Sequence, residues 1–163
     1  MNRRIKSAMI FATVAMAVPQ GVSAAGPNAK LWNGTWHLNP ATSKFQSPAK
    51  EQSETRTYDI SGGKLTMKSS SKDAAGKELN FSYSAAWNGK SYPMVGNPNA
   101  DSISITAVSA TQFRAKSRLK GKLTVQSTAT VSGDGKHITL KRKMLRLKGA
   151  VASPSRRPCT LGN

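Results

Sequence analysis

Hydrophobic and polar residues alternate along most of the middle of this chain. The clearest stretch is KELNFSYSAAW at residues 77–87. Its apolar positions fall on one face: Leu79, Phe81, Tyr83, Ala85 and Trp87. A period of two residues over this length predicts a half-buried β-strand with that face inward. Asn88-Gly89 follows as a typical hairpin turn, so residues 90–95 are expected to fold back beside this strand.

The same alternation recurs in short segments that turn residues separate. The predicted strands cover residues 35–38, 55–60, 65–69, 79–87, 90–95, 102–108, 112–119, 122–131 and 137–144. Short turns make consecutive strands neighbours in a sheet. Closing that sheet on itself removes its exposed edges. We therefore predict an all-β fold, an antiparallel up-and-down β-barrel of about eight to nine strands.

The sequence NGTWHLNPATSKF at residues 33–45 is expected to begin the barrel. Trp36 and Leu38 alternate inward on its first strand. Asn39 is a typical helix N-cap residue, and Pro40 suits the first helical position because its missing N–H is not needed there. We therefore predict a short helical turn after the first strand, at residues 40–45, with Phe45 packed under the end of the barrel.

The two ends of the chain differ from the alternating middle. A basic start, an apolar run at residues 8–18 and small residues up to Ala24-Ala25 are typical of a signal peptide. We predict cleavage near Ala24-Ala25, which removes residues 1–25 and leaves an exported protein, either periplasmic or secreted. The barrel domain is expected at residues 26–148. Residues 149–163 show no alternation and contain two prolines, so we predict an irregular basic tail.

The chain is strongly basic, with 25 Lys and Arg against 7 Asp and Glu and a formal net charge of +18. Loss of the signal peptide removes three of these cations and leaves +15. Such an excess indicates either attraction to an anionic partner or a well-solvated surface. The charge is densest near the C-terminal end. The candidate anion-binding residues there are Lys141, Arg142, Lys143, Arg146 and Lys148.

The sequence offers no arrangement typical of a catalytic site. Its two histidines, His37 and His137, fall opposite the apolar faces of their strands, so we expect both at the surface. The acidic residues are scattered, no cluster has the spacing of metal ligands, and Cys159 alone cannot form an internal disulfide. We therefore predict a protein that is not an enzyme and has no catalytic residues, metal or cofactor.

The inward aromatic residues are the stronger functional candidates. An eight-stranded barrel is just wide enough either to be filled by side chains or to hold one small ligand. Two hypotheses therefore stay open, a packed core and a cavity for a small hydrophobic ligand. The candidate cavity-lining residues are Trp36, Tyr58, Met67, Phe81, Tyr83, Trp87, Tyr92 and Phe113.

The alternative function is that of a structural or interaction protein with a packed core. Its basic C-terminal region would then bind an anionic surface, either acidic lipid or another polyanion. The expected export and the lack of aromatic residues among these cations disfavour nucleic acid, whose bases stack on exposed rings. The sequence carries no indication of the oligomeric state.

Three stretches occur in the order seen in a group of small exported bacterial proteins: WNGTWHLNPATSKF, WNGKSYPMVGNPNADSI and VSGDGKHITLKRKM. Over about residues 32–148 the chain resembles this lipocalin-like, calycin-type family through a G-T-W-x-L-N-x-x-x-S-K-F opening, a [DN]-G-K-x-Y-P-x-x-G turn and a late D-G-K hairpin. The resemblance implies a β-barrel. In lipocalins the helical turn precedes the first strand, whereas in fatty-acid-binding proteins it follows, as predicted here.

The end of the chain departs from the family pattern. The resemblance implies a last strand with alternating apolar residues after residue 148, and the sequence AVASPSRRPCTLGN does not supply one. A shifted reading frame or a divergent tail would both produce this departure. We favour the shifted frame, and the seam beside the first strand is then expected to be incomplete.

Overall fold

The computed structural model describes residues 26–44, 51–145 and 156–162. These residues form one short helix and ten β-strands. They are α1 (Ala29–Trp32), β1 (Gly34–Leu38), β2 (Glu51–Ser61), β3 (Lys64–Asp73), β4 (Glu78–Ala86), β5 (Tyr92–Val95), β6 (Ser102–Ser109), β7 (Gln112–Leu119), β8 (Lys122–Val131), β9 (His137–Met144) and β10 (Arg156–Gly162). No helix in these described ranges is long and apolar enough to cross a membrane. The predicted signal peptide and Phe45 lie outside them.

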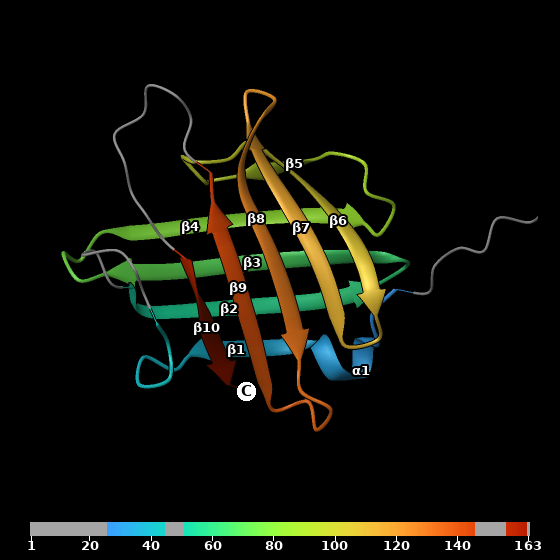
Figure 1. The fold of residues 1–163 in the computed structure, drawn as a ribbon, viewed down its shortest axis with the longest axis horizontal. Helices are drawn as coiled ribbons and strands as arrows, with labels where there is room; N and C mark the ends of the chain where they lie inside the picture. Colours follow the sequence, from blue (N-terminus) through green and yellow to red (C-terminus); the bar gives the residue numbers. More distant parts are fainter. Residues whose placement is uncertain (1–25, 45–50, 146–155, 163) are drawn as a thin grey trace, which may run out of the picture.

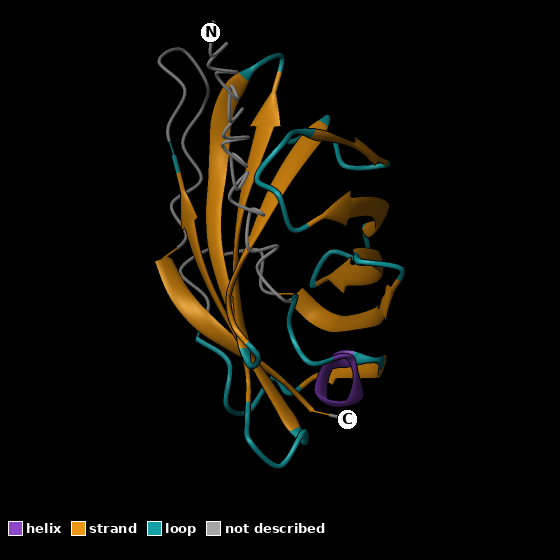
Figure 2. Cartoon of the chain, turned by 90° about the vertical axis from the view of Figure 1, so that its right-hand side faces the viewer, coloured by secondary structure: helices purple, strands orange, loops and turns teal. Residues whose placement is uncertain are grey.

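The ten strands close into one antiparallel barrel. Neighbours along the chain are neighbours in the sheet, and β10 joins β9 to β1. Figures 1 and 2 show β6–β10 crossing in front of β1–β4, so that the barrel is flattened into two layers with the core between them. The prediction of an all-β, up-and-down barrel is confirmed. The predicted number of eight to nine strands is wrong, because the structure has ten.

Alternation and glycine turns account for most of the strands. Along β3, every second side chain from Leu65 to Ser71 is buried, and those between them are exposed or half-buried. Between β2 and β3, Gly62 and Gly63 have φ angles of 54° and 72°. Positive φ at both central residues suits the type I′ turn that two-residue hairpins prefer. The local sequence therefore specifies both the strand faces and the turn.

After Asn88-Gly89 the chain folds back beside β4 as predicted, but the connection between the two strands is longer than a two-residue turn. β5 pairs antiparallel with β4, as expected, but begins only at Tyr92. Gly89 donates its backbone N–H to the carbonyl oxygen of Ile105 on β6 at 3.0 Å, and Asn88 pairs with Thr106. The Asn-Gly pair is thus tied to the next strand but one and does not close a two-residue hairpin.

The helical turn precedes β1, so its predicted position after the first strand is wrong. Asn28 caps α1, because its side-chain oxygen accepts a hydrogen bond from the Lys30 N–H at 3.1 Å. Residues 40–42 form only a turn, which Asn39 stabilises by accepting a hydrogen bond from the Ala41 N–H at 3.1 Å. An Asx turn of this kind uses the same side-chain acceptor as a helix cap. α1 occupies the position that the lipocalin resemblance implies.

Part of the predicted irregular tail is a strand. β10 pairs with β9 from Arg156 to Gly162, and with β1 at Leu161 and Gly162. Leu161 is fully buried and joins the core. Pro158 lies where β10 has only β9 as its described neighbour, and an edge position tolerates the missing N–H. The seam is closed in the structure, which corrects the expectation of an incomplete one.

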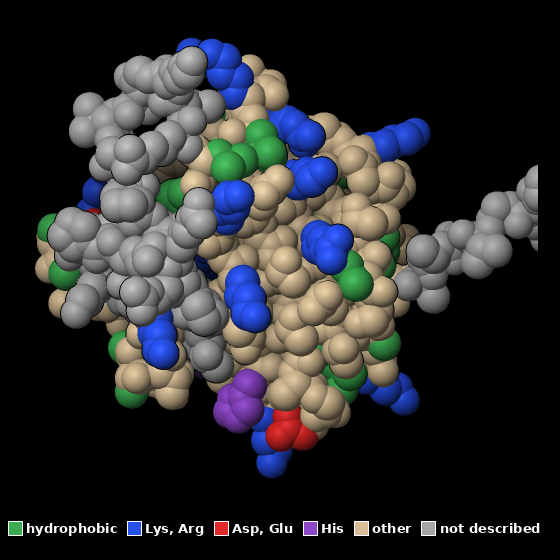
Figure 3. Space-filling model, viewed as in Figure 1, with side chains coloured by type: hydrophobic (Ala, Val, Ile, Leu, Met, Phe, Trp, Pro, Cys, Tyr) green, Lys and Arg blue, Asp and Glu red, His purple; other side chains and the backbone are tan. Residues whose placement is uncertain are grey.

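The outside of the barrel is charged unevenly. Figure 3 shows Lys and Arg side chains spread over the face formed by β7, β8 and β9, with acidic groups only near the margins of the view. The outward positions of these strands include Arg114, Lys116, Lys141 and Lys143, all exposed. This face lies on the opposite layer from β2–β4, which carry most of the acidic residues.

Candidate functional site

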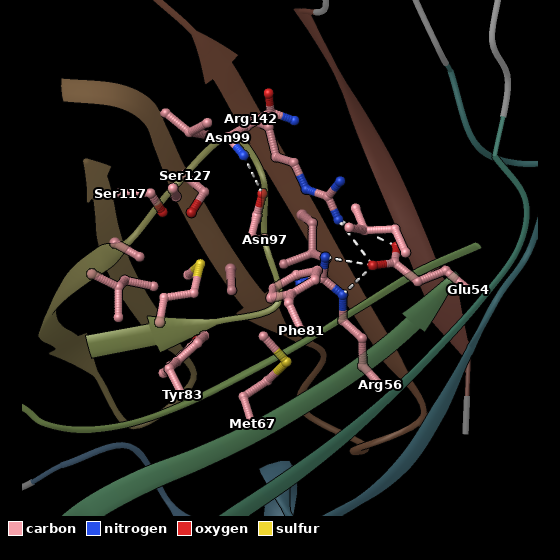
Figure 4. A pocket seen from close by; sticks show the side chains of 18 of the residues that line it. Glu54, Arg56, Met67, Phe81, Tyr83, Asn97, Asn99, Ser117, Ser127 and Arg142 are labelled. Atoms are coloured by element: carbon pink, nitrogen blue, oxygen red, sulfur yellow. Dashed lines mark hydrogen bonds and ion pairs between the residues drawn. The ribbon is translucent and has the colours of Figure 1, made fainter. Parts of the chain in front are cut away.

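A partly enclosed cavity of about 240 Å³ lies inside the barrel (Figure 4). Its walls are mostly apolar and come from both layers of strands. They include Met67, Leu79, Phe81, Met94, Ile103 and Leu140. The loop after β5 borders the cavity with Asn97 and Asn99, where the Asn99 N–H donates to the Asn97 side-chain oxygen at 2.9 Å. The structure therefore supports the cavity hypothesis over a fully packed interior.

An aromatic cluster fills the barrel between this cavity and α1. The ring of Trp32 lies 4.9 Å from that of Phe113 and 5.8 Å from that of Tyr58, centroid to centroid. Trp32 donates its indole N–H to the Ala110 carbonyl at 3.2 Å, and Trp36 donates its own to the Trp32 carbonyl at 3.0 Å. Tyr58 and Phe113 also line the cavity. They form its floor, and the α1 end of the barrel is closed.

A buried ionic cluster lies on the cavity wall at the other end. Glu54 on β2 is 2% exposed. Its carboxylate accepts a hydrogen bond from Arg56 Nε at 2.6 Å and from the Ser69 hydroxyl at 3.0 Å. Arg142 on β9 donates from Nη2 to Oε2 of Glu54 at 3.2 Å. Arg56 also lies 5.9 Å from the centre of the Phe81 ring, which allows a cation–π contact.

Electrostatics keep this carboxylate ionised. Burial by itself opposes ionisation of Glu54, but the charges of Arg56 and Arg142 and the hydrogen bonds from Arg56 and Ser69 outweigh it and lower the Glu54 pKa from 4.5 to about 2. Two guanidinium groups, which stay protonated in proteins, thus surround one carboxylate. Arg56, Arg142 and Glu54 together carry one net positive charge on the wall of a mostly apolar cavity.

Tyr83 adds a hydrogen-bonding group to the cavity wall. Burial, followed by the proximity of Tyr58, raises the pKa of the Tyr83 phenol well above its ordinary value of 10, although Arg56 partly opposes this shift. The phenol is therefore neutral at physiological pH. A neutral phenol both donates and accepts hydrogen bonds, so Tyr83 supplies a polar contact within an apolar surface.

Five of the eight predicted cavity residues line the cavity: Tyr58, Met67, Phe81, Tyr83 and Phe113. The other three lie elsewhere. Trp36 is fully buried at the closed end. Trp87 is half-buried against Phe113, with 5.5 Å between ring centroids. The hydroxyl of Tyr92 is bonded to the Asn88 side chain at 2.9 Å, outside the cavity lining. Ligand contact by any of the eight stays a prediction.

The predicted basic run divides between the two faces of β9. Lys141 and Lys143 are exposed on the outside of the barrel, whereas Arg142 points inward to Glu54. Arg146 and Lys148 lie outside the described residues. The predicted basic residues therefore do not form one surface, because successive residues of a strand point to opposite faces of the sheet.

Sequence reasoning missed Glu54, Arg56 and Arg142 as cavity residues. The available signal was alternation itself. Glu54 and Arg56 stand four and two positions before the inward Tyr58, and Arg142 stands two positions after the inward Leu140. Charged residues on an inward face are rare unless they are paired; the Arg56–Glu54 pair is local, whereas the Arg142–Glu54 pair joins residues 88 positions apart.

Both histidines are exposed at the surface, as expected. His37 and His137 stand opposite Gly162 from the two sides of β10. His37 Nδ1 lies 3.2 Å from the Thr55 hydroxyl. Within the part of the chain that the structure describes, no group of three or more His, Cys, Asp or Glu side chains could hold a metal ion.

The chain matches no protein-family model and no curated protein sequence. Among solved structures it is similar to a redesigned β-barrel, mFAP1, determined in complex with DFHBI. The two share 11% sequence identity with a TM-score of 0.41, over 85% of this chain and 100% of the other. A likeness at this level carries no argument about the site, and the lipocalin-like resemblance of the three sequence stretches stays a prediction.

Proposed function

We propose that this barrel binds a small amphipathic molecule in its cavity. The apolar part of the ligand lies along Met67, Phe81 and Ile103, and an anionic group faces Arg56 and Arg142. One observation carries the proposal, namely a hollow, mostly apolar interior whose wall holds the buried Arg56 and Glu54 and the half-buried Arg142.

The chemistry of the cavity favours an anion. A ligand carboxylate or phosphate would accept hydrogen bonds from the guanidinium groups of Arg56 and Arg142, and hydrogen bonds between charged groups are shorter and stronger than neutral ones. A ligand amine would add a third cation beside Arg56 and Arg142. The volume of about 240 Å³ lies just below the range of roughly 300–1,000 Å³ typical of small-molecule sites, so the ligand is small.

The wider setting of this function is part of the same proposal. We propose an exported protein that binds its ligand without transforming it, since Glu54, the carboxylate that accepts a hydrogen bond from the Ser69 hydroxyl, has a pKa of about 2 and is therefore a weak base. The export proposal has its own test. N-terminal sequencing of the protein recovered outside the cytoplasm should begin at Ala25 or Gly26, and a retained Met1 would contradict it.

Titration of the purified protein with decanoic acid, decanol and decylamine tests the ligand class. Tryptophan fluorescence is a suitable readout, because Trp32 contacts the two residues that form the cavity floor. We expect saturable binding, with decanoic acid bound about tenfold more tightly than decanol because a hydrogen bond to a charged group adds about 1.5–3 kcal/mol. Decylamine should bind most weakly.

Adjacent residues on β9 provide a matched pair of variants. Arg142→Met should remove the preference for the acid over the alcohol and leave decanol binding nearly unchanged. Lys143→Met removes the same charge from the outer face and should keep the preference. Failure of all three probes to bind saturably would contradict the cavity function, whereas equal affinity for acid and alcohol would contradict the anionic ligand class alone.

A further inference from the structure

The two layers of the barrel differ sharply in acidic residues. Strands β2–β4 contain five of the seven acids of the chain, and strands β6–β9 contain none. The remaining two, Asp101 and Asp134, lie in turns at the ends of these strands. A sheet face without acids has no internal partners for its cations, so its positive potential adds up across neighbouring strands.

The strand register arranges exposed cations in two rows, one along β7 (Arg114 and Lys116) and one along β9 (Lys141 and Lys143), with β8 between them. Lys116 on β7 and Lys143 on β9 stand on either side of Gln126 on β8. One step along the strands, Arg114 and Lys141 stand on either side of Thr128. All four cations are exposed. Because adjacent strands lie about 4.8 Å apart, the cations of β7 and β9 begin roughly 10 Å from each other.

The smaller side chains of β8 leave a hollow between these rows. This hollow has a volume of about 430 Å³ and is bordered by the four cations, with Gln126 and Thr128 between them. We call it the basic trough. The ion pairs of the described residues join Arg56 and Arg142 to Glu54, and Lys72 to Glu78, so none of them involves a cation of the trough.

We propose that the basic trough docks the barrel on an anionic phospholipid surface. The phosphate groups of the lipid lie between the two rows of cations, where Gln126 and Thr128 offer further hydrogen-bond donors. Lysine and arginine side chains held near such a surface are attracted by its negative potential. The trough lies on the broad outer face of the β7–β9 layer, which can approach a flat surface directly.

The aromatic residues favour lipid over nucleic acid as the partner. Proteins that bind single-stranded nucleic acid combine a basic groove with exposed rings on which bases stack. Phe113 is the one Phe, Tyr or Trp within β6–β9, and it is buried inside the barrel at 3% exposure. The trough therefore offers charge and hydrogen bonds without a stacking surface. The four trough cations do not line the cavity.

Vesicle co-sedimentation of the purified protein tests this proposal. One set of vesicles contains phosphatidylcholine with about 30% phosphatidylglycerol, the other phosphatidylcholine alone, both at about 0.15 M salt. We expect partition into the anionic vesicles only. Lys116→Gln/Lys143→Gln should weaken this partition roughly tenfold or more, since each cation near the surface contributes about fivefold.

The control is Lys64→Gln/Lys68→Gln, which removes two exposed cations from β3 on the other layer. It lowers the net charge equally and should weaken partition less than about twofold if the trough is the contact surface. A thermal unfolding curve checks that both variants fold. Equal losses in the two variants would show attraction to net charge alone and overturn the proposal.

Two further results would overturn it. One is the absence of partition into the anionic vesicles. The other is binding of a fluorescent single-stranded oligonucleotide that Lys116→Gln/Lys143→Gln selectively weakens while vesicle partition is unaffected, which would assign the trough to nucleic acid.

Discussion

The two ends of the barrel interior share one strand pattern and hold opposite contents. At the end covered by α1, Trp32, Trp36 and Phe113 fill the space, and the two indole N–H groups are bonded to backbone carbonyls. At the other end, Glu54 and Arg142 border a cavity of about 240 Å³. One end is a filled core and the other a charged hollow.

The difference develops along individual strands. The inward positions of β2 run from Glu54 through Arg56 to Tyr58, and those of β9 from Leu140 to Arg142. Alternation decides which residues face inward, and position along the strand decides whether they meet a filled or a hollow end. The closed end should therefore carry more of the stability, and the hollow end the binding chemistry.

The largest effect is expected from Trp36→Ala at the closed end. Trp36 is fully buried and does not line the cavity, so its removal leaves a new void. We expect a loss of about 3–5 kcal/mol in the free energy of unfolding, measured by urea titration. Phe81→Ala is the comparison at the hollow end. Phe81 is half-buried beside existing space, so it should cost about 2 kcal/mol. Equal costs would contradict the division into a filled and a hollow end.

The next largest effect is a loss of stability in acid, caused by the ionic cluster. The Glu54 pKa is about 2 in the folded protein, against 4.5 for a glutamate without these partners. The contribution of Glu54 to the free energy of unfolding is therefore complete above about pH 4.5. The contribution is lost as the pH falls from 4.5 through 2, because the unfolded chain takes up the proton first. Between neutral pH and pH 2 the loss should be about 3 kcal/mol.

Glu54→Gln is the control for this pH dependence. The variant should be less stable than the wild type at pH 7, because both arginines lose their counter-charge. Its unfolding free energy should then fall about 3 kcal/mol less on acidification than that of the wild type. Parallel pH profiles for the two proteins would show that Glu54 is not the titrating group.

The fold could be predicted in large part because its determinants are local. Period-two alternation and glycine turns lie within a few residues, and they place nine of the ten strands. β10 was missed because Pro158 and two arginines interrupt any alternation in residues 156–162. Its position depends on β1 and β9, which both need a partner to close the barrel. α1 has only four residues, too few to show a helical period.

The site could be predicted only in its apolar part. Aromatic residues such as Tyr58 and Phe81 are recognised on an inward face by their type alone. Charged residues on that face are recognised only once their partners are known, and Arg142 is 88 positions from Glu54. The same limit applies to the empty volume, because packing across the barrel decides whether inward rings meet or leave a cavity.

Gly96 tests how firmly the hollow end is held, with a smaller expected effect. Its φ is +86°, and a Cβ atom there would lie 2.2 Å from the Asn80 carbonyl oxygen. Gly96→Ala should lower the unfolding free energy by about 2–3 kcal/mol, since the left-handed conformation and the separation of β5 from β4 both add to the cost. Gly121→Ala is the control, because its φ is +76° but no atom lies within 4 Å. It should cost about 1 kcal/mol.

An equal cost for the two glycine variants would mean that β5 moves away from β4 freely, and that the hollow end is loosely held. The affinity for decanoic acid separates the two cases further. If the end is firmly held, Gly96→Ala shifts Asn97, Asn99 and Ala100, which border the cavity, and should weaken binding. Gly121→Ala should leave binding unchanged.

The smallest effect concerns two tryptophans at the closed end. Trp32 donates its indole N–H to the Ala110 carbonyl, whereas the buried indole N–H of Trp87 has no hydrogen-bond partner among the described residues. Replacement by phenylalanine removes the same ring volume at both positions, but only Trp32→Phe loses a hydrogen bond, and Trp87→Phe removes an unsatisfied donor. Trp32→Phe should therefore destabilise the protein by about 1 kcal/mol more than Trp87→Phe in urea unfolding. The reverse order would mean that the hydrogen bond from Trp32 to the Ala110 carbonyl does not stabilise the closed end.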